Sequence, residues 1–414
     1  MTQSRRDFLK RAACGAVGLS VMEPLLSRQA GSALAAVGDK IIVVVNLFGG
    51  NDGLNTVIPL TEYARYRQMR PHLGHERASI LPLSGQPDFG LNPGLTGLQT
   101  LFNQGRVAIL NGVGVPKEAT GLFDHSAQQF EFQTCDIVRN NNAVPPSGWL
   151  GRYLDNVTSD LVAPGIDMGG GKLMLTGSSF DPLTINSIDE LQLQVSFDED
   201  ARLAAYTDIM AIPHVPSQVG EKSRILRVQG LAQSDAIRAA TQSYVPAVTY
   251  PDTSLASNLQ QCAQIIYGDL GVRALGVGAG GFDTHGEQND GGYHDDLLKE
   301  VGDAIAAFYA DLKAHGLSDR VLILTISEFG RTPFENAARG TDHGYGSVAF
   351  AVGDSVHGGI YGDYPHLGDS WLAFGDLLDV TTDFRSVYAT AFANFMSVDP
   401  VPILGSNFPT LGYV

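Results

Sequence analysis

Three short glycine-containing segments carry the side chains in this sequence that could do chemistry. They are GGNDGLN at residues 49–55, GGFDTHGEQ at residues 280–288 and SEFGRTPFENAARGTDHG at residues 327–344. Each follows an apolar run and contains Asp, Glu or His, the side chains that bind divalent cations. Glycine lets the backbone approach a ligand closely. Together, the three segments predict a metal-dependent hydrolase site.

Apolar runs rich in β-branched residues predict the strands that position these segments. Such runs occupy residues 40–48, 107–110, 273–277, 321–326 and 347–352, and a run that is apolar throughout is typical of a strand buried on both faces. Between the third and fourth runs, an amphipathic helix is predicted from the spacing of Leu297, Leu298, Val301, Ile305, Phe308 and Leu312. Alternating buried strands and helices predict an α/β fold with a mostly parallel central sheet and helices on both faces.

The candidate ligands lie just after or just before the predicted strands. In a parallel α/β sheet, ligands bind outside the carboxyl ends of the strands. We therefore expect six side chains to converge at one end of the sheet as metal ligands: Asp52, Asp283, His285, Glu328, Asp342 and His343.

The N-terminal residues predict export. SRRDFLK at residues 4–10 is a twin-arginine signature, and a short apolar stretch and Ala33-Leu34-Ala35 follow it. We expect residues 1–35 to be a cleaved signal peptide, with the twin-arginine export machinery as a partner and a periplasmic or extracellular mature chain. The apolar stretch is too short for a membrane helix, so no stable membrane insertion is expected after cleavage. A retained anchor is the alternative.

Composition excludes some partners. The formal net charge is −17, and removal of the basic signal leaves a still more acidic chain, which argues against nucleic acid as a partner. Two cysteines remain after cleavage, Cys135 and Cys262, and either one disulfide or two free thiols fit an oxidising compartment. Residues 136–246 carry no comparable motif and are expected to form an insertion of loops and helices.

The three segments resemble the signature segments of domain of unknown function family 1501, exported bacterial proteins of the alkaline-phosphatase-like superfamily. The resemblance implies one alkaline-phosphatase-like α/β domain over residues 36–414, with one or two divalent ions (Zn, Mn, Ca or Fe). It matches Asp52, Asp283, His285 and His343 to ligand positions of the superfamily, and Asp342 could add an oxygen ligand. Where the superfamily has Asp-His or Asp-Asn after a strand, this chain has Glu328-Phe329, so one ligand is missing.

The resemblance also implies catalytic and substrate-binding residues. The superfamily places a nucleophilic Ser or Thr at a helix start, and residues 123–127 (FDHSA) match that place, with Ser126, Asp124 and His125 as the catalytic candidates. Metal-bound water is the alternative nucleophile, and Asp124 could serve as an N-cap alone. Arg331, Asn51 and Asn55 are the candidates for substrate binding. The alternatives are an ion pair with Glu328 for Arg331 and turn formation for the two asparagines.

These observations predict an exported metal-dependent hydrolase that acts on a small anionic phosphate or sulfate ester. A non-catalytic, metal-containing binding or surface-assembly protein with the same fold is the alternative, since the nucleophile is unclear. Twin-arginine export also suggests a redox enzyme, but the sequence contains no dinucleotide, haem or iron–sulfur motif.

Overall fold

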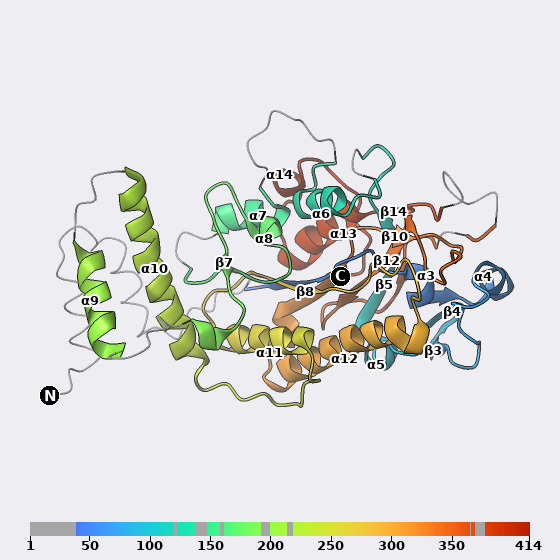
Figure 1. Cartoon of the computed structure of the whole chain (residues 1–414), viewed down its shortest axis with the longest axis horizontal. Coiled ribbons are helices and arrows are strands. Elements are labelled where there is room, and N and C mark those ends of the chain that lie inside the picture. The colour runs from blue at the N-terminus through green and yellow to red at the C-terminus, as the bar shows by residue number, and fades with distance from the viewer. Residues whose placement is uncertain are drawn as a thin grey trace.

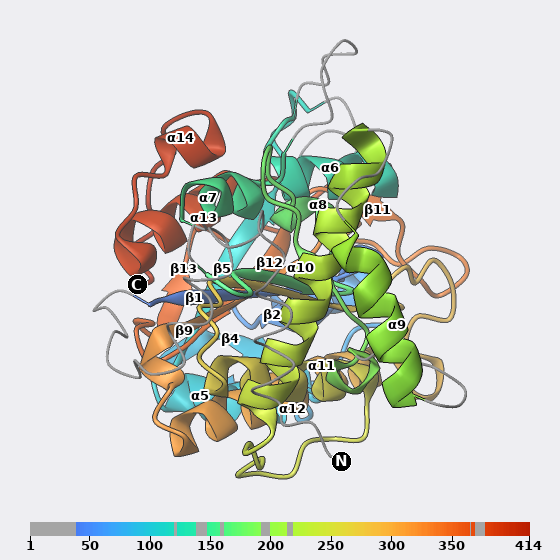
Figure 2. The ribbon, with the colours of Figure 1, turned by 90° about the vertical axis from the view of Figure 1, so that its left-hand side faces the viewer.

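A large central sheet lies between two layers of helices in the computed structural model (Figures 1 and 2). The structure describes residues 39–119, 122–137, 147–157, 161–191, 199–212, 218–364, 366–368 and 377–414. The nine strands of the sheet are β1 (Ile41–Leu47), β5 (Val107–Gly114), β6 (Gly165–Met168), β7 (Leu183–Thr184), β8 (Ala274–Ala279), β9 (Val321–Ile326), β12 (Ser347–Val352), β13 (Gly359–Tyr361) and β14 (Thr382–Asp383). Their order is β13-β5-β12-β9-β1-β8-β6-β7, and β14 pairs with β5.

The middle of the sheet is parallel. Strand β1 pairs in parallel with β8 and β9, and β6 pairs in parallel with β8. Strand β12 runs antiparallel to both β9 and β5. All five strands predicted from apolar runs are present, and the predicted fold class is confirmed.

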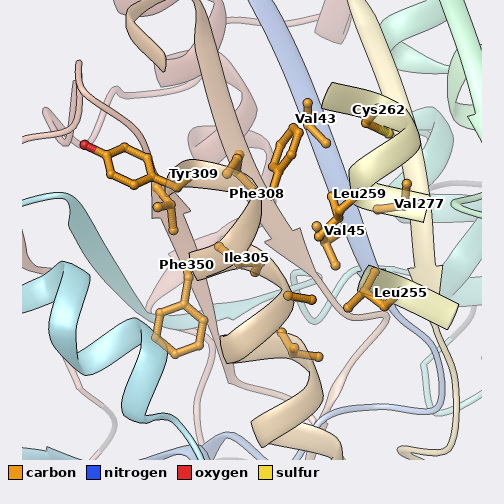
Figure 3. Packing of buried hydrophobic residues seen from close by; sticks show 14 of the residues in the cluster. Val43, Val45, Leu255, Leu259, Cys262, Val277, Ile305, Phe308, Tyr309 and Phe350 are labelled. Atoms are coloured by element: carbon orange, nitrogen blue, oxygen red, sulfur yellow. The ribbon is translucent and has the colours of Figure 1, made fainter. Parts of the chain in front are cut away.

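Side chains of β1 alternate between two cores, one on each face of the sheet. Ile41, Val43 and Val45 pack in the first core with helices α5 (Thr96–Asn103), α11 (Ser254–Tyr267) and α12 (Tyr293–Ala314), as Figure 3 shows in part. Ile42 and Val44 pack in the second. The helices of that face are α6 (His125–Thr134), α7 (Trp149–Val157), α8 (Lys172–Leu175), α13 (Phe384–Thr390), the π-helix η5 (Ala391–Met396) and α14 (Val401–Leu404). This two-sided burial explains why residues 41–45 are all apolar.

Smaller elements surround the sheet. A three-stranded sheet contains β2 (Val57–Pro59), β3 (Leu81–Leu83) and β4 (Gln86–Leu91), and a two-stranded one contains β10 (Gly330–Arg331) and β11 (His343–Gly344). The remaining helices are α3 (Gly53–Thr56), α4 (Tyr63–Met69), η2 (Ile188–Glu190), α9 (Glu199–Ala211), α10 (Gln218–Thr241), η3 (Asp290–Gly292) and η4 (Ser318–Arg320). Helices α9 and α10 project from one end of the molecule in Figure 1. The range 136–246, expected to hold loops and helices, also supplies β6 and β7 to the central sheet.

The described residues begin after the predicted signal peptide and include both remaining cysteines. The twin-arginine signature and the cleavage site lie in residues 1–38, outside the described residues. Among the described helices, none is long and apolar enough to cross a membrane. Cys135 and Cys262 are both buried free thiols, so the structure has the second of the two arrangements expected for them.

Candidate metal centre

Parallel pairing brings the three glycine-containing segments to one edge of the central sheet. At the carboxyl end of β1, Leu47 lies opposite Ala279 of β8, and Asn46 lies opposite Ile326 of β9. Beyond the strands, the Phe282 backbone N–H donates to the Phe48 carbonyl (3.2 Å). Residues 49–52, 280–285 and 327–331 therefore leave the sheet side by side, as the placement of the motifs predicts.

Three side chains form a cluster with the spacing of metal ligands. One nitrogen each from His125 and His343 and one carboxylate oxygen of Asp283 all lie within 4.8 Å of one another. The Nε2 atoms of His125 and His343 are 3.5 and 3.3 Å from Asp283 Oδ1. His125 begins α6, His343 lies in β11, and Asp283 follows β8.

A third imidazole, that of His285, adjoins this cluster. Its Nε2 atom lies 3.1 Å from Asp283 Oδ1 and 2.9 Å from the Nε2 atom of His343. Three histidine Nε2 atoms thus surround a single carboxylate oxygen. The side chains of His285 and Asp283 are 46% and 49% exposed, so solvent reaches this side of the cluster.

The donor set fits a divalent ion. Ligand atoms of a tetrahedral zinc ion with bonds of about 2.0–2.2 Å are about 3.3–3.6 Å apart, close to the spacings around Asp283 Oδ1. In addition, the buried His125 Nε2 atom has no hydrogen-bond partner. A buried polar atom without a partner is costly, and a cation between these groups would satisfy it. Three imidazoles and one carboxylate are donors typical of zinc and other late transition metals.

Charges around Asp283 keep its carboxylate ionised. Partial burial by itself would raise the pKa of Asp283, but the hydrogen bond and the charge of Arg331 lower it to about 2. Burial lowers the pKa of His343 below its usual value. At neutral pH the cluster therefore presents an ionised oxygen and an uncharged imidazole, the protonation states that metal binding requires.

Arg331, predicted to bind substrate, is fully buried and holds the segments together. Its Nη2 atom donates to Asp283 Oδ1 (2.7 Å) and to the carbonyl oxygens of Phe282 and Gly49, and its Nε atom donates to the Gly50 carbonyl. Its Nη1 atom donates to the Thr341 carbonyl (2.9 Å). Because all of its nitrogens are engaged inside the protein, Arg331 is not part of the substrate site proposed below.

Two predicted ligands, Glu328 and Asp342, contact the histidines from the side away from the cluster. Glu328 Oε1 lies 2.9 Å from His125 Nδ1 and accepts from the Gly49 N–H at 2.8 Å. Asp342 Oδ1 lies 3.0 Å from His285 Nδ1. His343 Nδ1 faces the Phe123 carbonyl at 2.8 Å. Glu328 and Asp342 therefore lie behind the histidines, at their Nδ1 atoms, and not among the atoms of the cluster.

Asp52, the first predicted ligand, lies in a buried ion pair. Its Oδ2 atom accepts from Arg70 Nη1 at 2.5 Å and from Gln288 Nε2 at 2.6 Å, while its Oδ1 atom caps α3 by accepting from the Asn55 N–H. Arg70 also donates to the carbonyls of residues 332 and 333. The carboxylate is occupied by these partners, and Asp52 is outside the ligand set proposed below; a role in metal binding stays a prediction.

Asn51 and Asn55, predicted to bind substrate, are fully buried. The Asn51 side chain exchanges hydrogen bonds with Thr56, and Asn55 Nδ2 donates to the Leu73 carbonyl. Both amides therefore hold the loop after β1, which corresponds to the turn-forming alternative, and neither belongs to the proposed substrate site.

The three predicted catalytic residues at the start of α6, Asp124, His125 and Ser126, lie in different surroundings. Asp124 is the N-cap, and its Oδ1 atom accepts from the Ala127 N–H at 2.7 Å. His125 points into the cluster with Asp283 and His343, whereas the sequence indicates a catalytic role for it. Ser126 is exposed, and neighbouring positions on a helix point about 100° apart, so its hydroxyl does not share the direction of His125. Its role as nucleophile stays a prediction.

Sequence reasoning missed Arg70 and Gln288. Both are fully buried and bind the Asp52 carboxylate, but neither lies in a pattern that distinguishes a buried partner from a surface residue. A signal did exist for His125, since it stands beside the predicted helix start and carries a common metal-binding group.

Close backbone packing at Gly49 yields a test of the site's geometry. Gly49 has φ +118°, and a Cβ atom there would lie 2.3 Å from the Asp283 backbone nitrogen. We expect Gly49→Ala to displace Asp283, to weaken metal binding and to cost at least about 1–3 kcal/mol of unfolding free energy. Gly280→Ala is the control, because a Cβ there meets nothing within 4 Å. Equal metal affinity and melting temperature in the two variants would contradict the described packing.

The comparison with protein families agrees with the sequence motifs. The family model described as "Protein of unknown function (DUF1501)" matches residues 235–380, and no curated protein matches. Among solved structures, a protein in the alkaline phosphatase superfamily from Vibrio parahaemolyticus is similar with a TM-score of 0.39 and 10% identity, over 89% of this chain and 69% of that chain. A sulfatase from Pseudoalteromonas sp. has a TM-score of 0.39 and 12% identity, over 99% and 75% of the two chains.

A phosphonate monoester hydrolase from Silicibacter pomeroyi has a TM-score of 0.29 and 10% identity, over 89% of this chain and 77% of that chain. Similarities at this level carry no argument about activity. The family match covers the second and third glycine-containing segments, with Asp283, His285 and His343 among its residues. The resemblance of this chain to DUF1501 is therefore confirmed over residues 235–380.

Proposed function

We propose that the chain is a metal-dependent hydrolase of phosphate or sulfate esters. The observation that carries the proposal is the convergence of three Nε2 atoms, from His125, His285 and His343, on Asp283 Oδ1. His125, Asp283 and His343 would hold one divalent ion, with His285 as a further donor. The ester class rests on the resemblance of the three segments to the superfamily.

The chain's own residues would prepare this site for hydrolysis. A divalent ion held there would polarise an ester oxygen and lower the pKa of a water molecule to about 7. Asp283 contributes a negative charge that Arg331 holds in place (2.7 Å). The exposed side of Asp283 and His285 admits a small ester. Beside His285, a surface hollow of about 480 Å³ is lined by Gly286, Glu287 and residues 337–339.

Hydrolysis by water, rather than by Ser126, fits the position of the Ser126 side chain. We expect Ser126→Ala to keep the wild-type metal content and to change the rate of ester hydrolysis by less than about threefold, because the hydroxyl diverges from His125 on the helix surface. Steady-state rates and metal content of the two proteins test this expectation. A loss of more than about 100-fold at unchanged metal content would assign the attack to Ser126.

The decisive experiment measures metal and activity on the same preparation. The purified mature chain would be loaded separately with Zn²⁺, Mn²⁺, Ca²⁺ or Fe²⁺, its metal content determined, and each form assayed against phosphate and sulfate monoesters and diesters. We expect one ion per chain and hydrolysis of at least one ester that a chelator abolishes. The absence of any bound ion would overturn the proposal.

A metal-containing binding protein is the second candidate. Two observations favour it. No described side chain hydrogen-bonds the hydroxyl of Ser126, the candidate nucleophile. Asp52, which the resemblance matches to a ligand position, is paired with Arg70 instead. If the chain binds one ion per molecule and cleaves no ester in the panel, this second function is the better account.

A further inference from the structure

We propose that Glu328 and Asp342 are positioning residues that aim two histidines at the metal, and that neither is a ligand. The inference rests on the proposed metal site and concerns the groups behind it. Metal-binding histidines usually donate their second ring N–H to a carboxylate or carbonyl, which sets the tautomer and the direction of the ring. In this chain, each of the three histidines has such an acceptor.

The hydrogen-bond acceptor of the His343 ring is a backbone carbonyl. Its Nδ1 atom lies 2.8 Å from the Phe123 carbonyl oxygen. A carbonyl oxygen can only accept, so Nδ1 carries the hydrogen, and in the neutral ring Nε2 then presents its lone pair toward Asp283 and His285. Phe123 is suited to present its carbonyl because it has a left-handed backbone (φ 66°) just before α6.

Glu328 and Asp342 contact the equivalent nitrogen of the other two histidines. Glu328 Oε1 lies 2.9 Å from His125 Nδ1, and Asp342 Oδ1 lies 3.0 Å from His285 Nδ1. A carboxylate only accepts hydrogen bonds, so both rings carry hydrogen on Nδ1, and in the neutral rings, the form that binds a metal, Nε2 has a lone pair. The three lone pairs and Asp283 Oδ1 face one another without a hydrogen between them, an arrangement that a cation stabilises.

The other partners of Glu328 keep it on this outer side. Besides His125, its Oε1 atom accepts from the Gly49 N–H at 2.8 Å and from Gln129 Nε2 at 3.1 Å. Its Oε2 atom lies 3.4 Å from Ser327 Oγ, and the side chain is only 1% exposed. Because Nδ1 and Nε2 lie on opposite sides of an imidazole, an oxygen bound at Nδ1 is too far from an ion at Nε2 to be its ligand.

Asp342 is held in a similar way, although its side chain is 61% exposed. Asn336 Nδ2 donates to the same Oδ1 atom at 3.1 Å and also to the His285 carbonyl at 2.9 Å. The Asn336 amide thus links the carboxylate to the backbone of the histidine that it orients. This arrangement fixes Asp342 on the Nδ1 side of His285.

The test measures the affinity of the site for a metal ion and, separately, the number and type of its ligands. Wild type, Glu328→Gln and Asp342→Asn would be loaded with Co²⁺, whose visible absorption reports ligand number and type, and affinity would be measured by chelator competition. We expect both variants to bind one Co²⁺ per chain with the wild-type spectrum and with affinity about 10–100-fold weaker. His343→Ala, measured with enough Co²⁺ to fill its weakened site, provides the spectrum of a site that has lost a ligand.

One control variant and the choice of two test positions keep the result interpretable. Asp290→Asn removes an exposed carboxylate that pairs with Arg339 instead of a histidine, and its affinity is expected to stay within about twofold of wild type. Because Glu328 is buried and Asp342 is exposed, a folding defect of Glu328→Gln leaves Asp342→Asn as an independent test.

The proposal is overturned for a residue whose variant shows a ligand-loss spectrum or retains wild-type affinity. Failure of wild type to bind Co²⁺ would instead remove the proposed metal site, and this inference with it. The two failures are therefore distinguishable by the behaviour of wild type alone.

Discussion

Replacing His343 by alanine is expected to abolish stable metal binding by the purified chain. The Nε2 atom of His343 lies 3.3 Å from Asp283 Oδ1 and 2.9 Å from His285 Nε2, so its loss opens the centre of the cluster. The affinity should fall by more than about 100-fold, beyond the 10–100-fold typical for residues that only orient ligands. Metal content after dialysis and chelator competition measure this effect.

The matched control for this prediction is His357→Ala. His357 is an exposed histidine whose Nδ1 atom faces the Gly412 carbonyl at 3.3 Å, away from the cluster. This variant should keep the metal content and ester hydrolysis of wild type. Retention of wild-type metal content by His343→Ala, with the control also unchanged, would exclude the cluster as the metal centre.

Replacing Asp52 by alanine should instead destabilise the fold and leave metal binding intact. The Asp52–Arg70 pair is buried, with side chains 1% and 0% exposed and 2.5 Å between the oxygen and nitrogen. Removing one partner leaves a buried charge uncompensated, which costs about 3–5 kcal/mol. Urea unfolding measures this loss, and metal titration of the folded variant should still give one ion per chain. Loss of the ion without loss of stability would support Asp52 as a ligand.

A double variant tests whether Asp52 and Arg70 stabilise the fold as a pair. In Asp52→Ala, Arg70→Met, no buried charge is left unpaired, and its loss of stability should be smaller than the sum of the two single losses. If the losses are additive, the two side chains do not act as a pair.

Acid should weaken the same ion pair and so lower the free energy of unfolding. Burial by itself would raise the pKa of Asp52, but the Arg70 charge and hydrogen bond outweigh it, so the pKa is lower in the folded state. The stabilisation is therefore fully present above the unfolded pKa of about 3.9 and is lost as the pH falls through the folded value. Below pH 4, the stability of wild type should approach that of Asp52→Ala.

Much of the fold could be predicted because burial leaves a direct pattern in the sequence. Strand β1 has side chains buried on both faces, and its five consecutive apolar residues, Ile41 to Val45, are the pattern that such burial produces. Helix α12 buries Leu298, Val301 and Ile305 on one side, as its 3.6-residue spacing requires. Strands β6 and β7 are short, with four and two residues, and so short a run does not stand out from a loop.

The candidate site could be predicted in its composition but not in its arrangement. Asp283, His285 and His343 were identified because Asp and His follow or precede apolar strands. His125 was expected to assist catalysis, and its position among the metal donors became clear when α6 was placed opposite β11. Glu328 has the chemistry of a ligand, yet three hydrogen-bond donors contact one of its oxygens, and those donors come from α6 and the loop after β1, both far from Glu328 in the sequence.

By itself, the sequence determined which segments meet. Parallel strands have their carboxyl ends at one edge of the sheet, so motifs placed after β1, β8 and β9 must lie together. The tertiary structure alone decided which carboxylate faces the histidines and which is enclosed in the interior. Asp283 and Asp52 both follow a strand within a glycine-containing segment, but Arg70 and Gln288 bind Asp52 in the interior, whereas Asp283 stays half exposed among three imidazoles. The partners that make this difference are up to 236 residues apart in the chain, and local sequence patterns carry no information about contacts at that separation.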